Sequence, residues 1–412
     1  MRFALSTKKM STAALLICLL LIGLLRANAQ YFDLKNGRKH VTIPFRLIRN
    51  MIVIKLKING KGPFNFVLDT GVGLMLITEP TLIDSIDLTS KITIPIPGLG
   101  EGKDNEAYLT PDLAVDIQGL SSHNVYAALL KEDKFNLSNY AGISVQGLLG
   151  YEFFSKLAIR INFADSTLVV CRPSDLRHLR KRPFIPITIE DRKAYMRATV
   201  VYSSGEKTDS KLVIDIGSGH PILIDNRVKN NDIPLKSIAA NLGVGLNGPI
   251  NGYISRINEV DIGSYKLSNV IVALPDDNKS YINNPVSRDG NLGIEILKKF
   301  DVIFDYPEGK LYLKPGSNFN EPFEHDMSGM EYYAADNFTH IIISRVEHGS
   351  PAEDLGLEEG DEILSINLKP VSKMTLEDID TLFKSRDNRT VLLEVYHSKE
   401  YYFLVLKLKR RV

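Results

Sequence analysis

The sequence has few cysteines, almost no net charge and no long apolar run beyond its N-terminus. Cys18 and Cys171 are the two cysteines among 412 residues, and Cys18 lies in the N-terminal apolar run. One cysteine cannot form an internal disulfide, so hydrophobic cores must stabilise the fold. The net charge of +1 argues against a nucleic-acid or polybasic membrane surface. The eight histidines lack the spacing of a metal site, so we expect no metal and no cofactor.

The first 29 residues have the parts of an export signal. A basic start precedes an apolar run from 13 to 25, and Ala27-Asn28-Ala29 resembles an A-x-A cleavage site. The run is short for a membrane span, although an uncleaved anchor is the alternative. We therefore expect an exported protein, periplasmic or secreted, that begins near Gln30 and has no stable membrane span after cleavage.

The central part of the chain contains one pattern twice. Phe66–Gly71 and Leu212–Gly217 are apolar runs that end in an aspartate, one more residue and a glycine. An aspartate at the end of a buried strand is costly unless the fold uses its charge. Two in register suggest paired carboxylates that share one proton, one acting as base and the other as acid. The further matches are Leu99–Gly102 with Leu242–Gly245, Val115–Ile117 with Val260–Ile262, and Gly147–Gly150 with Gly290–Gly293.

Each repeated unit is predicted to be mostly β-structure with one short helix. Strands are predicted over 51–58 and 64–68, and Asn59-Gly60 between them is a hairpin signal. The helices are predicted at Tyr151–Leu157 and Ile294–Phe300, directly after the repeated glycine.

The C-terminal segment has a different pattern. A strand is predicted at His340–Val346, and Ser350–Glu353 has the residues of a helix start. A second helix is predicted from Thr375 to about Ser385, followed by strands at Thr390–Tyr396 and Tyr401–Lys409.

The repeated units resemble the aspartic proteases of the pepsin and retroviral-protease clan. Asp69-Thr70-Gly71 is that clan's D-[TS]-G motif, and Leu148-Leu149-Gly150 and Asn291-Leu292-Gly293 match its second signature. The resemblance covers about 40–314. It implies that Asp69 and Asp215 form a catalytic dyad around one water and hydrolyse peptide bonds without a covalent intermediate.

The resemblance also implies roles for residues around the dyad. Gly71 and Gly217 would let the backbone approach the carboxylates, and Thr70 and Ser218 would support them. Glycine-rich hairpins, the flaps, would close over an extended peptide at 97–107 and 241–253. The flap glycines are Gly100, Gly102, Gly243 and Gly245.

Two departures from the family pattern leave the activity open. Ile216 stands where the family has Thr or Ser, whose hydroxyl normally joins its counterpart from the other lobe beneath the dyad. Val72 stands where pepsin-type lobes carry a hydroxyl. The alternatives are a catalytically inactive peptide-binding protein of this fold, or a structural repeat whose aspartates cap local turns.

The C-terminal segment resembles a bacterial PDZ domain. Gly349–Ala352 and Gly356–Asn367 carry the pattern. PDZ domains bind a peptide as an added strand between a strand and a helix, here expected at His340–Val346 and Leu376–Phe383. The alternative is a module that only packs against the lobes, with a structural or regulatory role. The expected groove residues are Ile341, Ile342 and Ile343 of the strand, and Gly329, Met330, Glu331 and Tyr332 of the carboxylate-binding loop, where Glu331 replaces a usual glycine.

Together these features predict a mainly β chain with two pseudo-symmetric acid-protease β-barrel lobes and an α+β PDZ domain. The expected function is an exported aspartic endopeptidase with a PDZ domain for peptide binding or regulation. The expected partners are a peptide or protein substrate and a peptide in the PDZ groove, and a monomer suffices because both units are in one chain. The expected boundaries are signal peptide 1–29, first lobe 30–171, linker 172–183, second lobe 184–314, linker 315–328 and PDZ domain 329–412.

Overall fold

The computed structural model describes residues 31–86, 92–96, 105–179, 182–225, 227–228, 233–276 and 285–412. The expected export signal and the first-flap glycines Gly100 and Gly102 lie outside the described residues. Within these ranges no helix has both the length and the apolar character needed to cross a membrane.

A nine-stranded sheet forms the first lobe. Its order is β1-β9-β6-β10-β5-β4-β8-β7, with β3 beside β4. The predicted hairpin is confirmed: β4 and β5 pair across Asn59-Gly60, whose positive φ angles of 49° and 78° fit the right-handed strand twist. The strands are β1 (Asp33–Leu34), β3 (Arg46–Ile48), β4 (Met51–Ile58), β5 (Lys61–Leu68), β6 (Met75–Ile77), β7 (Ile92–Ile96), β8 (Asn105–Ile117), β9 (Leu120–Leu130) and β10 (Gly147–Leu149).

An eight-stranded sheet of similar topology forms the second lobe. Its order is β14-β15-β16-β21-β17-β20-β19-β18. The strand before each aspartate pairs in parallel with the strand of the second signature, β5 with β10 and β16 with β21. The sequence repeat is therefore a repeat of structure. The strands are β14 (Thr188–Glu190), β15 (Lys193–Val201), β16 (Lys207–Asp215), β17 (Ile222–Ile224), β18 (Ile238–Gly245), β19 (Gly248–Ile262), β20 (Tyr265–Pro275) and β21 (Gly290–Gly293).

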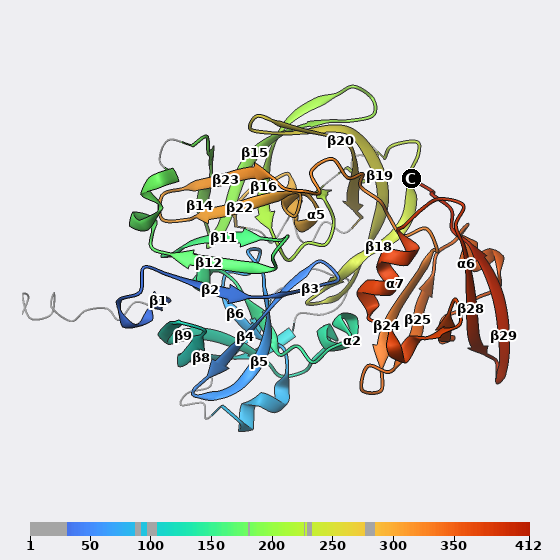
Figure 1. Ribbon diagram of the computed structural model, residues 1–412, viewed down its shortest axis with the longest axis horizontal. Coiled ribbons are helices and arrows are strands. Elements are labelled where there is room, and N and C mark those ends of the chain that lie inside the picture. Colours follow the sequence, from blue (N-terminus) through green and yellow to red (C-terminus); the bar gives the residue numbers. More distant parts are fainter. Residues whose placement is uncertain are drawn as a thin grey trace, which may run out of the picture.

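A third sheet of six strands joins the lobes (Figure 1). Its two halves come from different lobes and meet where β11 pairs with β22, with Ile159 opposite Phe304. Phe154 packs edge-on against Phe304 at 5.5 Å between ring centroids, so the core is continuous between the lobes. The strands, in order, are β13 (Ile185–Pro186), β23 (Lys310–Pro315), β22 (Phe300–Asp305), β11 (Ala158–Asn162), β12 (Thr167–Cys171) and β2 (His40–Pro44).

The helices of the lobes are short. α3 (Tyr151–Phe154) and α5 (Ile294–Leu297) lie where helices were predicted. The prediction of one helix per unit is wrong for the first lobe, which also contains α2 (Leu137–Ala141). Five residues are too few for a helical period to show in the sequence. The 3-10 helices of the described chain are η1 (Lys35–Gly37), η2 (Pro80–Asp84), η3 (Pro173–Leu179) and η4 (Val371–Lys373).

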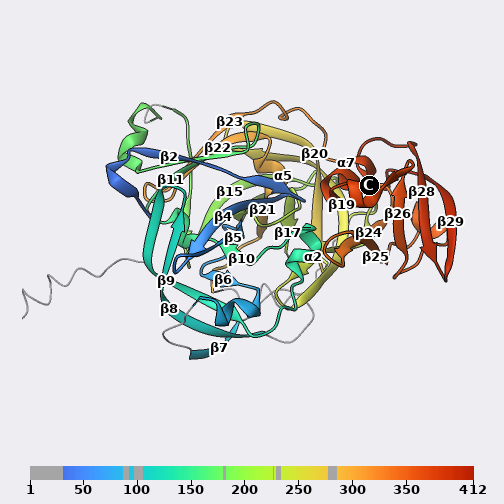
Figure 2. The same ribbon diagram turned by 60° about the horizontal axis from the view of Figure 1, so that its bottom comes forward.

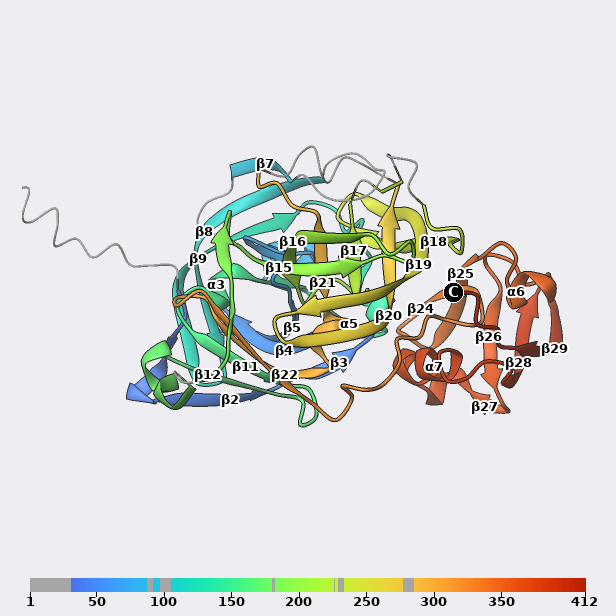
Figure 3. The same cartoon turned by 90° about the horizontal axis from the view of Figure 1, so that it is seen from above.

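The C-terminal domain has its own sheet and core, and it lies at one end of the molecule (Figures 1 and 3). The sheet order is β24-β25-β26-β28-β29, with β27 beside β26. Both predicted helix starts are confirmed, because Ser350 Oγ accepts from Glu353 N at 3.2 Å and Thr375 forms a capping box with Asp378. The elements are β24 (Met330–Ala335), β25 (His340–Val346), α6 (Pro351–Asp354), β26 (Glu362–Ile366), β27 (Lys369–Pro370), α7 (Leu376–Phe383), β28 (Thr390–His397) and β29 (Glu400–Lys407).

Candidate active site

Asp69 and Asp215 occupy equivalent places at the ends of parallel strand pairs. Asp69 follows β5, and its backbone N–H donates to Leu149 O of the second signature at 3.0 Å. Asp215 ends β16 in register with Gly293. A Cβ on Gly150 would overlap the carbonyl oxygen of Val72. The second signature needs its glycine because the aspartate loop folds directly over it.

The two carboxyl groups meet between the lobes. A Cβ on Gly71 would lie 2.8 Å from Asp215 Oδ2, and a Cβ on Gly217 would overlap the Asp69 carboxyl group. Each carboxyl group therefore lies against the glycine of the other lobe. Two carboxyl groups placed this way repel each other when both are charged, which favours a state in which they share one proton.

Three protein donors surround the Asp215 carboxylate. Oδ1 accepts from the backbone N–H groups of Gly217 at 3.0 Å and Ser218 at 3.2 Å. Oδ2 accepts from Asn291 Nδ2 at 2.7 Å. Ser218 thus supports Asp215 through its backbone amide. Hydrogen bonds to an anion favour the charged form of the group that accepts them.

The Asp69 carboxyl group has a poorer set of donors. Its Oδ1 accepts from Gly71 N at 2.7 Å. Burial of the carboxyl group and the nearby charge of Asp215 raise the pKa of Asp69 well above its ordinary value, although Gly71 N–H and the Lys193 charge act in the opposite direction. Burial among few donors therefore favours the protonated form of Asp69.

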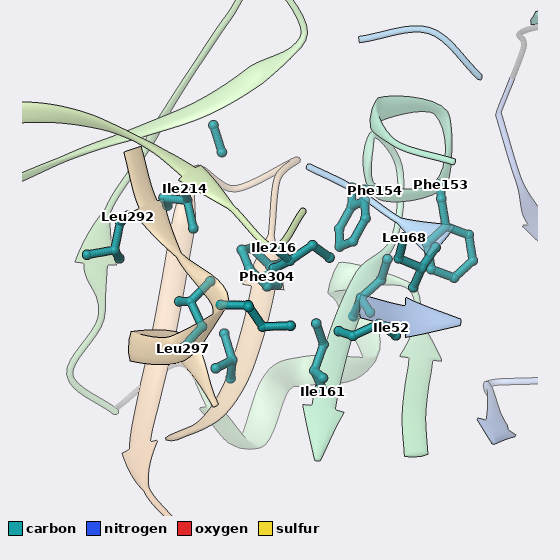
Figure 4. Packing of buried hydrophobic residues seen from close by; sticks show 14 of the residues in the cluster. Ile52, Leu68, Phe153, Phe154, Ile161, Ile214, Ile216, Leu292, Leu297 and Phe304 are labelled. Atoms are coloured by element: carbon teal, nitrogen blue, oxygen red, sulfur yellow. The ribbon is translucent and has the colours of Figure 1, made fainter. Parts of the chain in front are cut away.

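Thr70 partly compensates for the missing hydroxyl at Ile216. Thr70 is 1% exposed, and its Oγ1 donates to Ile214 O at 2.7 Å and accepts from Ile216 N at 3.0 Å. One hydroxyl thus makes two interlobe hydrogen bonds beneath the dyad. The Ile216 side chain is fully buried and packs in the core that contains Phe154 and Phe304 (Figure 4). Apolar packing occupies the position where the family has a second hydroxyl.

Two residues near the dyad were missed in the sequence. Asn291 stands in the second signature of the second lobe, where Leu148 occupies the equivalent place in the first lobe. The amide of Asn291 at this otherwise apolar position could have indicated the contact, because a buried amide requires a hydrogen-bond partner. Lys193, at the start of β15, is partly buried, and its charge lowers the pKa of Asp69. Nothing in its sequence context indicates proximity to an aspartate loop.

The range predicted for the second flap, 241–253, forms the end of the hairpin of β18 and β19. Gly243 has φ of 122° beside an irregularity in the strand pairing, and Gly245 pairs with the first residue of β19. At the tip, Leu246 packs against the apolar cluster of the first lobe, and its carbonyl oxygen accepts from Asn105 Nδ2 of β8. The second-lobe flap therefore extends across to the first lobe.

The expected strand of the PDZ groove needs correction. The backbone of β25 is paired on one side with β24 and on the other with β26, so it has no free edge for a peptide at Ile341, Ile342 and Ile343. Ile341 and Ile343 are buried in the PDZ core. The edge strand on this side of the sheet is β24, and it faces α7, because the Tyr332 ring contacts Phe383 at 5.9 Å between centroids. An added strand can pair only with a free edge.

The expected carboxylate-binding loop bonds to its own chain. Asp326 Oδ1 accepts from the backbone N–H groups of Ser328 and Gly329, each at 2.8 Å. Ser328 Oγ accepts from Met330 N at 3.1 Å. Within the predicted loop, the amides of Gly329 and Met330 are therefore already bonded inside the chain. Glu331 Oε2 instead accepts from Asn241 Nδ2 of the flap strand β18 at 2.7 Å.

Comparison with known proteins identifies both parts of the chain. The family model described as aspartyl protease matches residues 54–153, and the model described as PDZ domain matches 342–396. An aspartyl protease domain is thus found in the first lobe and a PDZ domain at the C-terminal end, in the mainly β fold predicted from the sequence. No curated protein matches it.

Two solved structures show distant similarity to the chain. Soybean basic 7S globulin is 10% identical with a TM-score of 0.39, over 69% of this chain and 97% of that one. A photosystem II D1 C-terminal processing protease is 21% identical with a TM-score of 0.19, over 20% of this chain and 22% of that one. The assignment of the protease and PDZ domains therefore rests on the family models.

Proposed function

We propose that the protein is an aspartic endopeptidase that hydrolyses peptide bonds with a water activated by Asp69 and Asp215. The observation that carries the proposal is the meeting of the two carboxyl groups, each against the glycine of the other lobe. Strand-end aspartates that only capped local turns would not need to meet across two lobes. The family match of the first lobe supports the same chemistry.

The unequal surroundings of the carboxyl groups suggest their roles. Asp215, with three donors, begins the reaction charged and takes a proton from the attacking water. Asp69, whose pKa is raised by burial and by its neighbour, begins protonated and donates a hydrogen bond to the substrate carbonyl oxygen. The proton that Asp215 gains is then available for the leaving nitrogen. Closure of the flap over an extended peptide would exclude bulk water.

A peptide-binding protein without catalysis is the second candidate, and Ile216 is the observation that favours it. The missing hydroxyl beneath the dyad would destabilise the site if it left buried backbone groups without hydrogen-bond partners. The two hydrogen bonds of Thr70 nevertheless join the lobes at this point. We therefore favour the enzyme.

Export belongs to the same proposal. Its support is the order of features in residues 1–29, where a basic start is followed by an apolar run and an A-x-A cleavage pattern. N-terminal sequencing of the protein purified from the cells that produce it should begin near Gln30. A start at Met1 would contradict export by cleavage.

Hydrolysis of unfolded protein tests the main proposal. The mature protein is incubated with a denatured protein mixture from acid to neutral pH, and new peptide termini are identified by mass spectrometry. We expect cleavage within chains, strongest on the acid side. Saturable peptide binding without any cleavage across this range would establish the binder instead.

A further inference from the structure

The groove between β24 and α7 of the PDZ domain holds an arginine of the first protease lobe. Arg49 Nε and Nη2 donate to Asp380 Oδ2 at 2.9 Å and Oδ1 at 3.2 Å, so the pair is bidentate. Arg49 Nη1 donates to Tyr332 O of β24 at 3.1 Å. The guanidinium also lies over the rings of Tyr140 and Tyr332, at 4.4 and 5.1 Å from their centroids. One side chain thus bridges the edge strand and the helix.

The chemistry of this groove fits arginine better than lysine. Besides Asp380, helix α7 supplies Glu377, whose Oε2 accepts from Arg49 N at 2.7 Å. A planar guanidinium can make a bidentate carboxylate contact and stack on aromatic rings at once, whereas an ammonium group makes a single point contact. The Arg49–Asp380 pair is well shielded, with side-chain exposures of 12% and 17%.

A second segment of the first lobe occupies the same groove. Helix α2 packs against β24, and the views in Figures 1 and 2 show them side by side. A Cβ on Gly142, which ends α2, would lie 3.0 Å from Leu376 Cδ1 and 3.7 Å from Ala334 Cβ. The backbone at Gly142 therefore lies between the helix and the edge strand. A peptide paired with β24 would have to displace this segment as well as Arg49.

The occupied groove is connected to the loop that carries Asp215. Asn50, the neighbour of Arg49 in the β3–β4 turn, donates through Nδ2 to Gly219 O at 3.2 Å and Glu295 Oε1 at 3.0 Å. Lys384, directly after α7, lies 3.7 Å from the same Glu295 oxygen. The turn that fills the groove thus also contacts the second-lobe loop four residues beyond its aspartate.

We propose that the PDZ groove recognises an arginine side chain within an extended segment, without a free carboxylate, and that Arg49 of the first lobe is its resident occupant. The partner is a peptide or unfolded chain that places one arginine against Asp380 and pairs its backbone with β24. The intramolecular contact competes with it, because a tethered group acts at a high effective concentration. This surface is additional to the proposed peptidase site.

A binding experiment on the full chain tests the proposal. The Asp69→Asn background prevents cleavage of the probe, so the result does not depend on the proposed activity. The probe is a labelled peptide with the sequence of residues 45–53, acetylated and amidated, and binding is followed by fluorescence anisotropy. Adding Arg49→Ala to the protein should raise probe affinity by about tenfold or more, since the tethered arginine no longer competes for Asp380. Arg49→Lys should give an intermediate affinity.

Matched variants make the result specific. Arg197→Ala, which removes an exposed arginine paired with Asp209, should leave probe affinity unchanged. Replacing the arginine of the probe that corresponds to Arg49 by alanine should abolish most binding, as should Asp380→Asn in the Arg49→Ala protein. Circular dichroism checks the fold of each variant.

Three outcomes would overturn the proposal. The first is equal probe affinity in the Arg49→Ala and Arg197→Ala proteins. The second is equal binding of the alanine probe. The third is a gain of about tenfold or more when the probe carries a free C-terminal carboxylate, which would show recognition of chain ends through the loop around Gly329.

Discussion

Asp69 and Asp215 end equivalent strands of the two lobes, yet their surroundings differ. On the first-lobe side, Asp69 has one backbone donor, while its neighbour Thr70 supplies the hydroxyl that joins the lobes. On the second-lobe side, Asp215 has three donors, while the side chain of its neighbour Ile216 contributes only apolar packing.

The difference shows which parts of a duplicated site must stay alike. The strand pairing and the glycines next to the aspartates are kept in both lobes, because they bring the carboxyl groups together. The donors and the hydroxyl can be divided unequally between the lobes. The proposed mechanism uses this inequality, because it assigns different roles to the two carboxyl groups.

Loss of either carboxyl group is the largest expected change. Asp69→Asn and Asp215→Asn should each lower peptide hydrolysis by at least about 10²-fold, because general acid and base contributions are of that size or larger. Initial rates on one fluorogenic peptide measure the effect. Asp209→Asn on the same strand β16 is the control and should leave the rate unchanged. Near wild-type activity in both dyad variants would show that the meeting of the carboxyl groups is structural.

Loss of the Thr70 hydroxyl should mainly affect stability. Thr70→Val leaves the buried Ile214 O and Ile216 N without their shared partner, at about 1–3 kcal/mol for each group. Denaturant unfolding measures the free energy. Ile216→Val removes one buried methylene and should cost only about 0.5–1.5 kcal/mol. An equal loss of unfolding free energy in Thr70→Val and Ile216→Val would contradict the greater importance of the Thr70 hydroxyl at the interlobe contact.

Removal of the Asn291 amide tests the donor inequality directly. Asn291→Leu gives the second lobe the residue type of Leu148, and Asp215 loses a donor at 2.7 Å. A hydrogen bond to a charged group is worth about 1.5–3 kcal/mol, so the acid limb of the pH–rate profile should move up by about one to two pH units. Leu148→Met changes no donor and should leave the profile in place. An unmoved acid limb in Asn291→Leu would remove the support for Asp215 as the base.

The raised pKa of Asp69 should be visible in stability as well as in activity. The folded protein binds this proton more tightly than the unfolded chain, so the stabilisation is present at acid pH and is lost as pH rises through the folded pKa. Activity should fall over the same pH range as the dyad loses its shared proton. Asp69→Asn, which cannot ionise, should therefore melt at a higher temperature than the parent at neutral pH, with the difference vanishing below the ordinary aspartate pKa. A melting temperature that falls at neutral pH would contradict the assignment of the proton to Asp69.

Much of the fold could be predicted because each signal was local or repeated. The D-[TS]-G motif, the second signature and the PDZ pattern fix backbone geometry through glycines and apolar runs. The β25 strand was predicted at its observed bounds, but its role in the groove was not. Strand pairing is a property of the sheet, and nothing in His340–Val346 tells which neighbours occupy its two edges. Helix α2 was missed because it is only five residues long.

The sequence by itself determined that two aspartates end equivalent strands, that a PDZ domain follows them, and that one interlobe hydroxyl is missing. The tertiary structure alone decided what these facts mean. It brings Asn291 to Asp215 and places Ile216 in a shared core, because parallel strands bring distant residues into register. It also places Arg49 against Asp380, 331 residues away in the chain. Contacts of such sequence separation depend on how whole domains pack, and no local pattern records them.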